Sequence, residues 1–519
     1  MGKTSGSEEL DSICIVGGGT AGWMAAAALA QRLGRSTTRV FLVESDEIGT
    51  VGVGEATLPH IRSFNEGLGI DEAAFMRATE ATFKLGIEFR DWGKLGDRYT
   101  HPFGDYGRME DGLSFHHLWL RLRSHGSPCR LDDYSYAVRM AEENRFTRPQ
   151  TDPGTLQSSF GYAYQFDSTL YGRFLRDRAV SAGIERVEGR IVDWTLDGGT
   201  GHVTSIQLAD GRSVAADLYV DCSGFRGLLI EGALETGYEN WQDWLPCDRA
   251  LAVPSEVRRP LPPYTQATAR SAGWQWRIPL QHRTGNGYVY CSEFVDEESA
   301  REELLSNLDS PALADPRQLR FTTGRRRKFW NKNVVALGLA GGFLEPLEST
   351  SIHLVQEGIA ELIELFPDRD FHPGDESEYN RRMALNFERV RDFLLLHYVA
   401  TERSDTEMWR YFRAMRLPDS LEEKIEAWRH RGHVVAYEFG VFLPPSWIAV
   451  FMGQNVLPRS YDCRAERLPI DALRYRMKSV REDVSKAVGA TPAHESFISA
   501  CGAASESSAA HVRTNPYDL

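Results

Sequence analysis

The chain begins with two short apolar runs separated by a glycine turn and a helical stretch. Residues 12–16 are mostly apolar, and residues 21–33 are rich in alanine and leucine. Residues 40–43 form a second apolar run, which ends at Glu44. An apolar run followed by a turn, a helix and another apolar run predicts one β-α-β unit. We therefore expect an α/β fold with a Rossmann-type core.

A different pattern occupies residues 83–90, where every other side chain is apolar. A period of two predicts a strand with one buried face, and it places Lys84 on the polar face as a solvated lysine. Before this strand, a helix is expected to begin near Ile70 with Asp71 as its N-cap.

The middle of the chain mixes loops, hairpins and buried strands. Residues 94–160 are rich in Gly, His, Arg and aromatic residues, which is typical of long loops with short helices. Residues 184–220 alternate around two Asp-Gly turns and predict β-hairpins. Residues 334–337 predict another buried strand.

Helical periodicity dominates from residue 352 to about residue 429, and a last helix is expected near residues 471–488. This change of pattern predicts four regions along the chain. They are a flexible N-terminus at 1–11, an α/β core with inserted β-rich and loop segments at 12–350, a mostly helical lobe at 351–501 and a disordered Ala/Ser-rich tail at 502–519.

Composition narrows the class of protein. The 519 residues include 42% hydrophobic and 25% charged residues, which is ordinary for a globular protein. The net charge of −14 disfavours nucleic acid and an anionic membrane surface as partners. We see no membrane-spanning apolar run, and residues 1–11 lack the apolar centre of a signal peptide. Seven widely spaced cysteines without a Cys-x-x-Cys pair favour a cytoplasmic protein without a metal site or disulfide framework.

The glycine turn carries the first candidate chemistry. Its Gly-x-Gly-x-x-Gly pattern lies between the first predicted strand and helix, which is the context of a dinucleotide-binding turn. The first glycine would make the turn, the second would let the backbone approach pyrophosphate, and the third would let the helix pack on the strand. A carboxylate at the end of the second strand could bind ribose hydroxyls. The alternative is a purely structural turn. The residues expected to hold the dinucleotide here are Gly17, Gly19, Thr20, Ala21, Gly22 and Glu44.

Three further strings add to this site. Residues 220–224 and 338–342 each lead a strand into a glycine turn and resemble the second and third segments of FAD-binding folds of the monooxygenase type. Without that resemblance, they would be core strands that end in turns. Trp274 and Trp276 lie two positions apart in the string Trp-Gln-Trp-Arg-Ile-Pro, so they share one face of a strand. Two such rings can wall off a cofactor edge, although paired aromatic side chains also serve as core.

Several strings occur in one order along most of the chain. They are the glycine turn, residues 53–57, Phe83-Lys84, the tryptophan string and residues 343–350. Together they resemble flavin-dependent halogenases of the tryptophan-halogenase type. The resemblance implies an FAD-binding, monooxygenase-like core covered by the helical lobe. It also implies an enzyme that uses FADH2, O2 and halide to halogenate a small aromatic substrate, with a separate NAD(P)H-dependent flavin reductase as partner and a homodimer as one assembly to consider.

The resemblance assigns roles to the reacting groups. Lys84 matches the family's indispensable lysine, which would bind hypohalous acid or react with it to form a haloamine. Glu348 matches the nearby carboxylate, which would polarise the halogen donor or accept the proton of the substituted ring. By its position alone, Glu348 would be an acid at a helix N-terminus. Ser349 would link the flavin and substrate regions, and the amides of Thr350 and Ser351 match the halide site.

Other positions are carried over in the same way. The two tryptophans would keep the substrate away from the flavin. His101 and Phe103 match residues that sandwich an indole ring, with Trp447 as a third wall. By its position alone, His101 would be an ordinary loop histidine. The remaining flavin-binding residues are expected to be Val53, Gly54, Glu55, Ala56, Gly338 and Leu347.

Two departures from the family affect specificity. Ser351 stands where the family usually has glycine, which alters the backbone at the halide site and favours bromide. The paired tyrosines that hold the amino-acid part of free tryptophan are missing at residues 434–440. Because the charged groups of tryptophan would then lie unpaired, indole, a substituted indole or another electron-rich arene is the expected substrate.

Two other functions fit part of the same pattern. An FAD monooxygenase would hydroxylate an aromatic directly and give oxygenated product without halide. A flavin-binding protein without catalytic activity would retain FAD without turnover.

Overall fold

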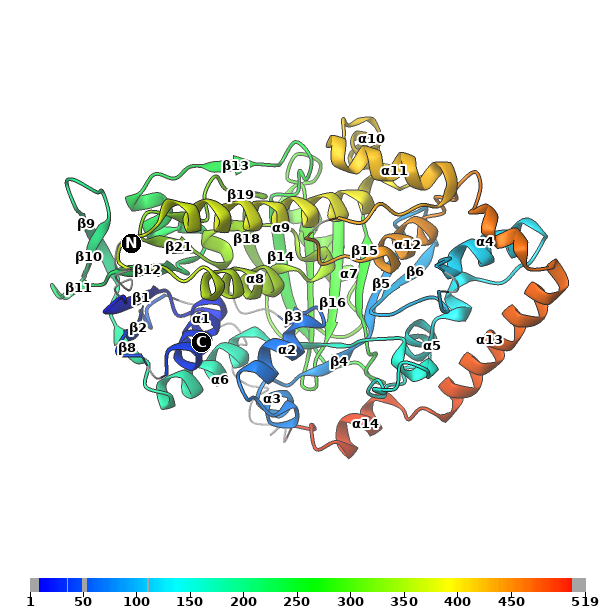
Figure 1. The fold of residues 1–519 in the computed structure, drawn as a ribbon, viewed down its shortest axis with the longest axis horizontal. Helices are drawn as coiled ribbons and strands as arrows, with labels where there is room; N and C mark the ends of the chain where they lie inside the picture. Colours follow the sequence, from blue (N-terminus) through cyan, green and yellow to red (C-terminus); the bar gives the residue numbers. More distant parts are fainter. Residues whose placement is uncertain (1–8, 35, 49–53, 110–111, 438, 506–519) are drawn as a thin grey trace, which may run out of the picture.

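A six-stranded sheet, which includes the first described strand, forms one end of the molecule (Figure 1). The computed structural model describes residues 9–34, 36–48, 54–109, 112–437 and 439–505. The strands of this sheet are β1 (Ser12–Val16), β2 (Arg39–Glu44), β8 (Glu185–Glu188), β12 (Leu218–Asp221), β20 (Trp330–Asn331) and β21 (Val334–Ala336). They lie in the order β20-β21-β12-β1-β2-β8, and every pair except β20-β21 is parallel. Because α1 (Thr20–Leu33) joins β1 to β2, the predicted β-α-β unit and Rossmann-type core are confirmed.

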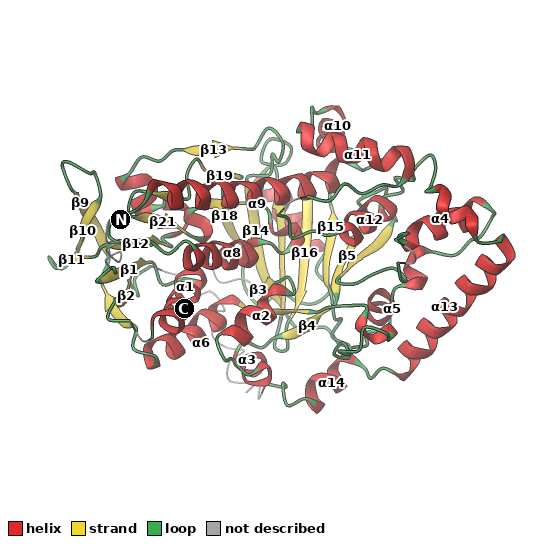
Figure 2. Ribbon diagram, in the orientation of Figure 1, coloured by secondary structure: helices red, strands yellow, loops and turns green. Residues whose placement is uncertain are grey.

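A seven-stranded sheet fills the middle of the molecule, between helices on both sides of the view (Figure 2). Its strands are β5 (Gly86–Arg90), β6 (Arg98–Pro102), β14 (Arg249–Ser255), β15 (Thr265–Ala269), β16 (Gly273–Pro279), β17 (Thr284–Tyr290) and β18 (Arg317–Arg320). Their order, β18-β14-β17-β16-β15-β5-β6, places the tryptophan string of β16 at the centre.

Three small sheets complete the strands. One contains β3 (Gly54–Ala56), β4 (Thr82–Lys84) and β7 (Ala163–Asp167) in the order β3-β7-β4. A second consists of β9 (Ile191–Leu196), β10 (Val203–Leu208) and β11 (Ser213–Ala215), which confirms the predicted hairpins. The third joins β13 (Tyr238–Asn240), β19 (Gly324–Arg326) and β22 (Gly342–Phe343).

The prediction of one half-exposed strand at residues 83–90 is wrong. The chain leaves β4 and enters β5 at Leu85, so the segment contributes to two different sheets. Both faces are therefore covered, and the side chains of residues 83–89 are all buried. Lys84, which the alternation alone placed in solvent, has no exposed surface.

The segment 94–160 also contains more regular structure than its composition predicts. The expected short helices are present as α4 (Phe115–Ser124) and α5 (Tyr136–Glu142). The strand β6 was not expected; it pairs antiparallel with β5 and brings His101 opposite Ile87. His101 is thus a strand residue, and the alternative of a loop histidine is excluded.

The helices before the C-terminal lobe include the predicted capped helix. Asp71 accepts a hydrogen bond from the amide of Ala74 at 2.8 Å and caps α3 (Glu72–Ala78), as expected. The others are α2 (His60–Gly67), α6 (Ser168–Ser181) and α7 (Glu297–Ser306).

The C-terminal region is helical, as predicted. Its helices are α8 (Ser351–Glu364), α9 (Pro373–Val399), α10 (Glu407–Ala414), α11 (Asp419–Arg431), α12 (Pro444–Gly453), α13 (Ile470–Ala490) and α14 (His494–Ala500). The helices α8 and α9 run across the strands of the core (Figure 1). One continuous hydrophobic cluster includes residues on both sides of position 350, so the two predicted regions share a core. Among the described residues, no helix is long and apolar enough to cross a membrane.

The described ends of the chain are packed. Leu10 is 2% exposed and its carbonyl accepts a hydrogen bond from Thr38 at 2.7 Å, so the predicted flexible N-terminus does not extend to residue 11. Ala503 is fully buried, and the amide of Ser505 donates to Gln281 at 2.8 Å. The predicted disordered tail therefore does not begin at residue 502, and its remainder lies outside the described residues.

Candidate active site

The three glycines of the first turn have different physical reasons to be glycine. Gly17 has φ +107°, and a Cβ there would lie 2.5 Å from the carbonyl oxygen of Cys222. A Cβ on Gly22 would lie 1.9 Å from the carbonyl oxygen of Gly17, so this glycine lets α1 pack on the turn. A Cβ on Gly19 would meet nothing within 4 Å. The protein therefore does not fill the space at Gly19, as a site for pyrophosphate requires.

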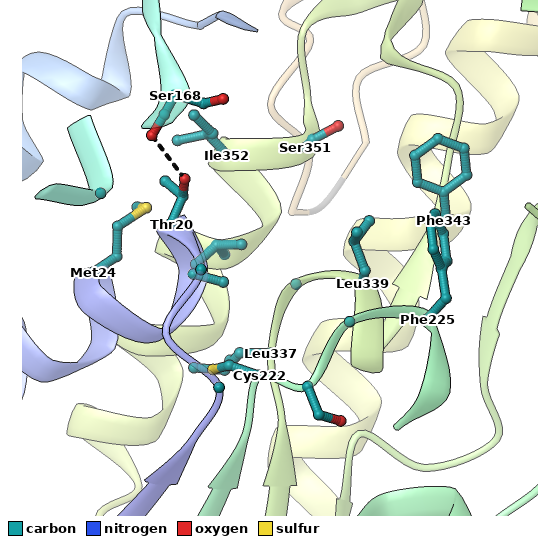
Figure 3. A pocket seen from close by; sticks show the side chains of 18 of the residues that line it. Thr20, Met24, Ser168, Cys222, Phe225, Leu337, Leu339, Phe343, Ser351 and Ile352 are labelled. Atoms are coloured by element: carbon teal, nitrogen blue, oxygen red, sulfur yellow. Dashed lines mark hydrogen bonds between the residues drawn. The ribbon is translucent and has the colours of Figure 1, made fainter. Parts of the chain in front are cut away.

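The start of α1 suits an anion. It has no side-chain cap and no acidic residue in its first turn, so its first amides are available to a phosphate. Thr20 turns its hydroxyl to the carbonyl of Ser168 at 3.2 Å instead (Figure 3).

A cavity of about 890 Å³ opens in front of this turn. Its wall combines the glycine turn with the ends of β2, β12 and β21 and with the start of α8, and Figure 3 shows Ser351 and Phe343 on it. Val53 lies outside the described residues. The predicted cofactor residues that line the cavity are Gly17, Gly19, Thr20, Ala21, Glu44, Gly54, Glu55, Ala56, Gly338 and Leu347. These residues fit an FAD, whereas Gly22 lies behind the turn and does not line the cavity.

Arginines on the cavity wall were not predicted. Arg173 and Arg176 of α6 and Arg226 after β12 line it, and their charges suit phosphate groups. No motif marks these residues, because α6 reaches the cavity only through the tertiary fold. Glu44 forms an ion pair with Arg186 at 2.5 Å from the end of β2.

Both tryptophans of β16 line the same cavity, with ring centroids 6.1 Å apart and ring planes inclined by 56°. Trp276 lies across the neighbouring strand, since a Cβ on Gly287 would be 2.0 Å from its ring. The indole N–H of Trp274 donates to the carboxylate of Glu345 at 2.9 Å, and the hydroxyl of Tyr398 donates to the same oxygen at 2.5 Å. Burial raises the pKa of Glu345 to about 7.

Lys84 is buried next to this cavity. Its Nζ donates to Ser349 Oγ at 2.8 Å and to the carbonyl of Thr57 at 3.0 Å, and it lies 5.1 Å from the ring centroid of Phe103. Burial lowers the pKa of Lys84 to about 7, although the charge of Glu348 acts in the opposite direction. Ser349 also lines the cavity, so one hydroxyl connects the cavity wall to the amine.

Ser349 holds a strained backbone for this contact. Its φ of +60° is the left-handed conformation that non-glycine residues rarely adopt, and it ends the 3₁₀ turn Pro346–Glu348. Strain of this kind is frequent at functional sites.

The carboxylate of Glu348 lies between two buried histidines. His101 Nδ1 is 2.8 Å from Oε2 and 3.0 Å from Oε1. His397 Nε2 of α9 is 2.7 Å from Oε1, a close ion-pair contact without an aligned hydrogen bond. Burial alone would raise the pKa of Glu348, but His101 and His397 together hold it at about 2. His397 was not predicted, since nothing in the local sequence of α9 distinguishes it from a core histidine.

Aromatic rings surround His101 on the side of the helical lobe. Phe103 is half-buried, with its ring centroid 6.5 Å from that of His101. Phe393 and Phe442, which were not predicted, stack at 3.8 Å and lie within 6.1 Å of His101. Trp447 is 1% exposed and packs edge-on against Phe393 at 5.0 Å. The roles of His101, Phe103 and Trp447 as substrate walls stay predictions.

The expected halide residues lie at the start of α8. Thr350 is fully buried, and its Oγ1 has no hydrogen-bond partner among the described residues. Ser351 begins the helix and lines the cavity. The first amides of a helix have no partner within it, which suits a small anion.

Comparisons with known proteins identify the family of this chain. A family model described as tryptophan halogenase matches residues 12–469. The chain therefore belongs to the tryptophan-halogenase family of flavin-dependent halogenases. It is an enzyme that halogenates an aromatic compound with reduced flavin, oxygen and halide, and such enzymes generally use a separate flavin reductase.

Individual relatives cover nearly the whole chain. Tryptophan 6-halogenase SttH of Streptomyces toxytricini is 37% identical over 478 residues, which is 86% of this chain and 90% of SttH. The structure of BrvH, a flavin-dependent halogenase from Brevundimonas sp. BAL3, superposes with a TM-score of 0.92 at 44% identity, covering 95% of this chain and 99% of that chain. Xcc4156, a flavin-dependent halogenase from Xanthomonas campestris, gives a TM-score of 0.91 at 44% identity, covering 95% and 98%.

Proposed function

We propose that this chain halogenates indole, a substituted indole or another electron-rich arene in preference to free tryptophan, and that it uses bromide better than chloride. The observation that carries the proposal is the buried amine of Lys84, which a single hydroxyl ties to the wall of the cofactor cavity. An electrophilic halogen made in the cavity can thus be received by a group outside it.

The cavity supports the cofactor role. Bound as FADH2, the flavin supplies, with O2, the oxidising equivalents that convert halide into hypohalous acid. The glycine turn and the start of α1 would hold its pyrophosphate, and Glu44 would hold a ribose. Trp274 and Trp276 would exclude the arene from the flavin, because their rings occupy one wall.

Lys84 would hold the halogen for transfer. With a pKa of about 7, roughly half of the amine is neutral at pH 7. The neutral amine can take the halogen as a haloamine, and the charged form can donate a hydrogen bond to hypohalous acid. Both routes deliver the halogen from the same atom, Nζ.

Glu348 would act on the arene as a base. A carboxylate held at a pKa of about 2 is ionised throughout the working range of the enzyme. It can accept the proton that the ring loses once the carbon–halogen bond has formed.

The substrate proposal rests on the contacts of Tyr437, which lies in the helical lobe after α11. Tyr437 lies within residues 434–440, and its hydroxyl donates to Asp392 at 2.8 Å. Its ring lies 3.6 Å from the ammonium of Lys424. This tyrosine is engaged in packing, which supports a substrate without the charged groups of free tryptophan. The bromide proposal rests on Ser351 at the predicted halide site.

A direct assay tests the proposal. The enzyme is supplied with NADH, a flavin reductase, FAD and bromide, together with indole or tryptophan in separate reactions, and products are identified by mass and bromine isotope pattern. Brominated product should form faster from indole, and bromide should compete well against equal chloride. A faster rate with tryptophan contradicts the substrate proposal, and hydroxylated product without halide indicates a monooxygenase. Lys84→Ala should abolish halogenation while FAD binding, measured by flavin fluorescence, is retained.

A further inference from the structure

The two oxygens of Glu348 are not equivalent. Oε1 has two nitrogen neighbours, His101 Nδ1 at 3.0 Å and His397 Nε2 at 2.7 Å. Among the described residues, Oε2 has one nitrogen neighbour, His101 Nδ1 at 2.8 Å. All three residues are at most 1% exposed, so water does not replace these contacts. A carboxylate has about four lone-pair positions, and the more open of them are therefore at Oε2.

His397 is itself fixed in place. Its Nδ1 lies 2.8 Å from the carbonyl oxygen of Phe393, one turn earlier in α9. Because a carbonyl only accepts, Nδ1 carries a proton. Nε2 attracts the carboxylate only if it carries a proton as well, so His397 holds Oε1 as an imidazolium. The rings of Phe89 and Trp92 pack on the imidazole at 4.8 and 6.0 Å and block its rotation.

The charges around Glu348 come from several elements. Lys84 approaches from β4 and His101 from β6, while His397 approaches from α9. Tyr99 of β6 also interacts electrostatically with the carboxylate of Glu348. Burial raises the pKa of Tyr99 well above its ordinary value, so this tyrosine stays neutral. Of these groups, His397 is the one that contacts Oε1 alone.

We propose that His397 is a positioning residue of the halogenation site, which holds Oε1 of Glu348 so that Oε2 is the oxygen presented to the substrate. The inference rests on the proposed function, in which Glu348 accepts the proton of the arene. In that step the carbon–halogen bond has already formed, the carbon–hydrogen bond breaks, its electron pair returns to the ring, and Oε2 takes the proton. Without His397, the carboxylate can turn, and removal of the proton becomes slow.

The test compares His397→Phe with His116→Phe as a matched control. His116 is also buried, and both its ring nitrogens are bound, to Ser114 at 2.8 Å and to the carbonyl of Gly432 at 2.8 Å. Reduced FAD is supplied in excess, and bromination is measured with ordinary indole and with ring-deuterated indole. His397→Phe should lower kcat about 10–100-fold with little change in KM and in FAD affinity. It should also make the deuterated substrate react more slowly, since loss of the ring proton now limits the rate.

His397→Gln provides the rescue. Its side-chain N–H can still reach Oε1, so kcat should partly recover and the isotope effect should shrink. A kcat within about twofold of the wild type for His397→Phe, or the same isotope effect in His116→Phe, overturns the inference. If His397→Phe does not fold, His397→Asn replaces it, because its shorter amide cannot reach Oε1 and should show the same isotope effect. Absence of halogenation in the wild type would contradict the proposed function instead, so the two failures are distinguishable.

Discussion

Replacing Lys84 with Met should remove activity and change how stability depends on pH. In the folded protein the amine is buried, with a pKa lowered from 10.5 to about 7. In the unfolded chain it has its ordinary pKa, so between pH 7 and 10.5 the unfolded state binds one more proton than the folded state. The wild type therefore gains about 1.4 kcal/mol of stability per pH unit from this group as pH rises through that window. The unfavourable contribution is fully present below pH 7 and is gone above pH 10.5.

The Lys84→Met variant has no amine at this position, so its stability lacks this pH dependence. The variant also loses the hydrogen bonds to Ser349 and Thr57. This loss lowers its free energy of unfolding by about 1–3 kcal/mol for each acceptor left unpaired. That cost does not vary with pH, so the comparison of slopes isolates the titration of the amine.

The assay is denaturant unfolding of both proteins at several pH values from 6 to 9.5. The free energy of unfolding of the wild type, relative to that of the variant, should rise by about 3 kcal/mol between pH 7 and 9.5. Halogenation by Lys84→Met should fall by about 10²–10⁴-fold or more. Parallel stability curves for the two proteins would show that the amine does not titrate in the fold as described, and the assigned chemistry of Lys84 would lose its basis.

Four further outcomes are expected. If the neutral amine of Lys84 is the reacting form, the single-turnover rate of bromination should rise about tenfold from pH 6 to pH 8, and a flat profile would contradict this. Gly19→Ala should weaken FAD binding in a fluorescence titration while the melting temperature is kept, because its Cβ enters only cofactor space. Gly22→Ala should instead destabilise the fold by about 1–3 kcal/mol, and equal effects of the two changes would refute the assignment of the turn. Ser351→Gly should move bromide-versus-chloride competition toward chloride, and an unchanged product ratio would remove Ser351 from halide selection.

The cofactor turn could be predicted because its causes are local. The strand, the glycine turn and α1 follow one another in the chain, Gly17 has a positive φ, and Gly22 lies against the carbonyl of Gly17. The environment of Lys84 could not be predicted, since its contact with Ser349 spans 265 residues. Alternation in residues 83–90 was a sound indicator of strand structure, but it carries no information on which sheets cover the strand.

The same limit applies to His397. It lies in the last turn of the long helix α9, among apolar residues, where a buried histidine usually serves the core. Its role depends on β6 bringing His101 to the other side of Glu348, and β6 itself lies in a segment whose composition favours loops. Only the resemblance to a family pointed to Glu348, and it said nothing of the residues that hold it.

The helix α9 touches both buried glutamates through consecutive residues, His397 to Glu348 and Tyr398 to Glu345. One residue added to or removed from α9 ahead of this pair would swing both side chains by about 100° about the helix axis. Glu348, which lies near Lys84, and Glu345, which binds Trp274, would then both lose their contact with α9. Engineering of α9 can thus change which residues occupy its exposed positions, but it has to preserve the number of residues in the helix ahead of His397.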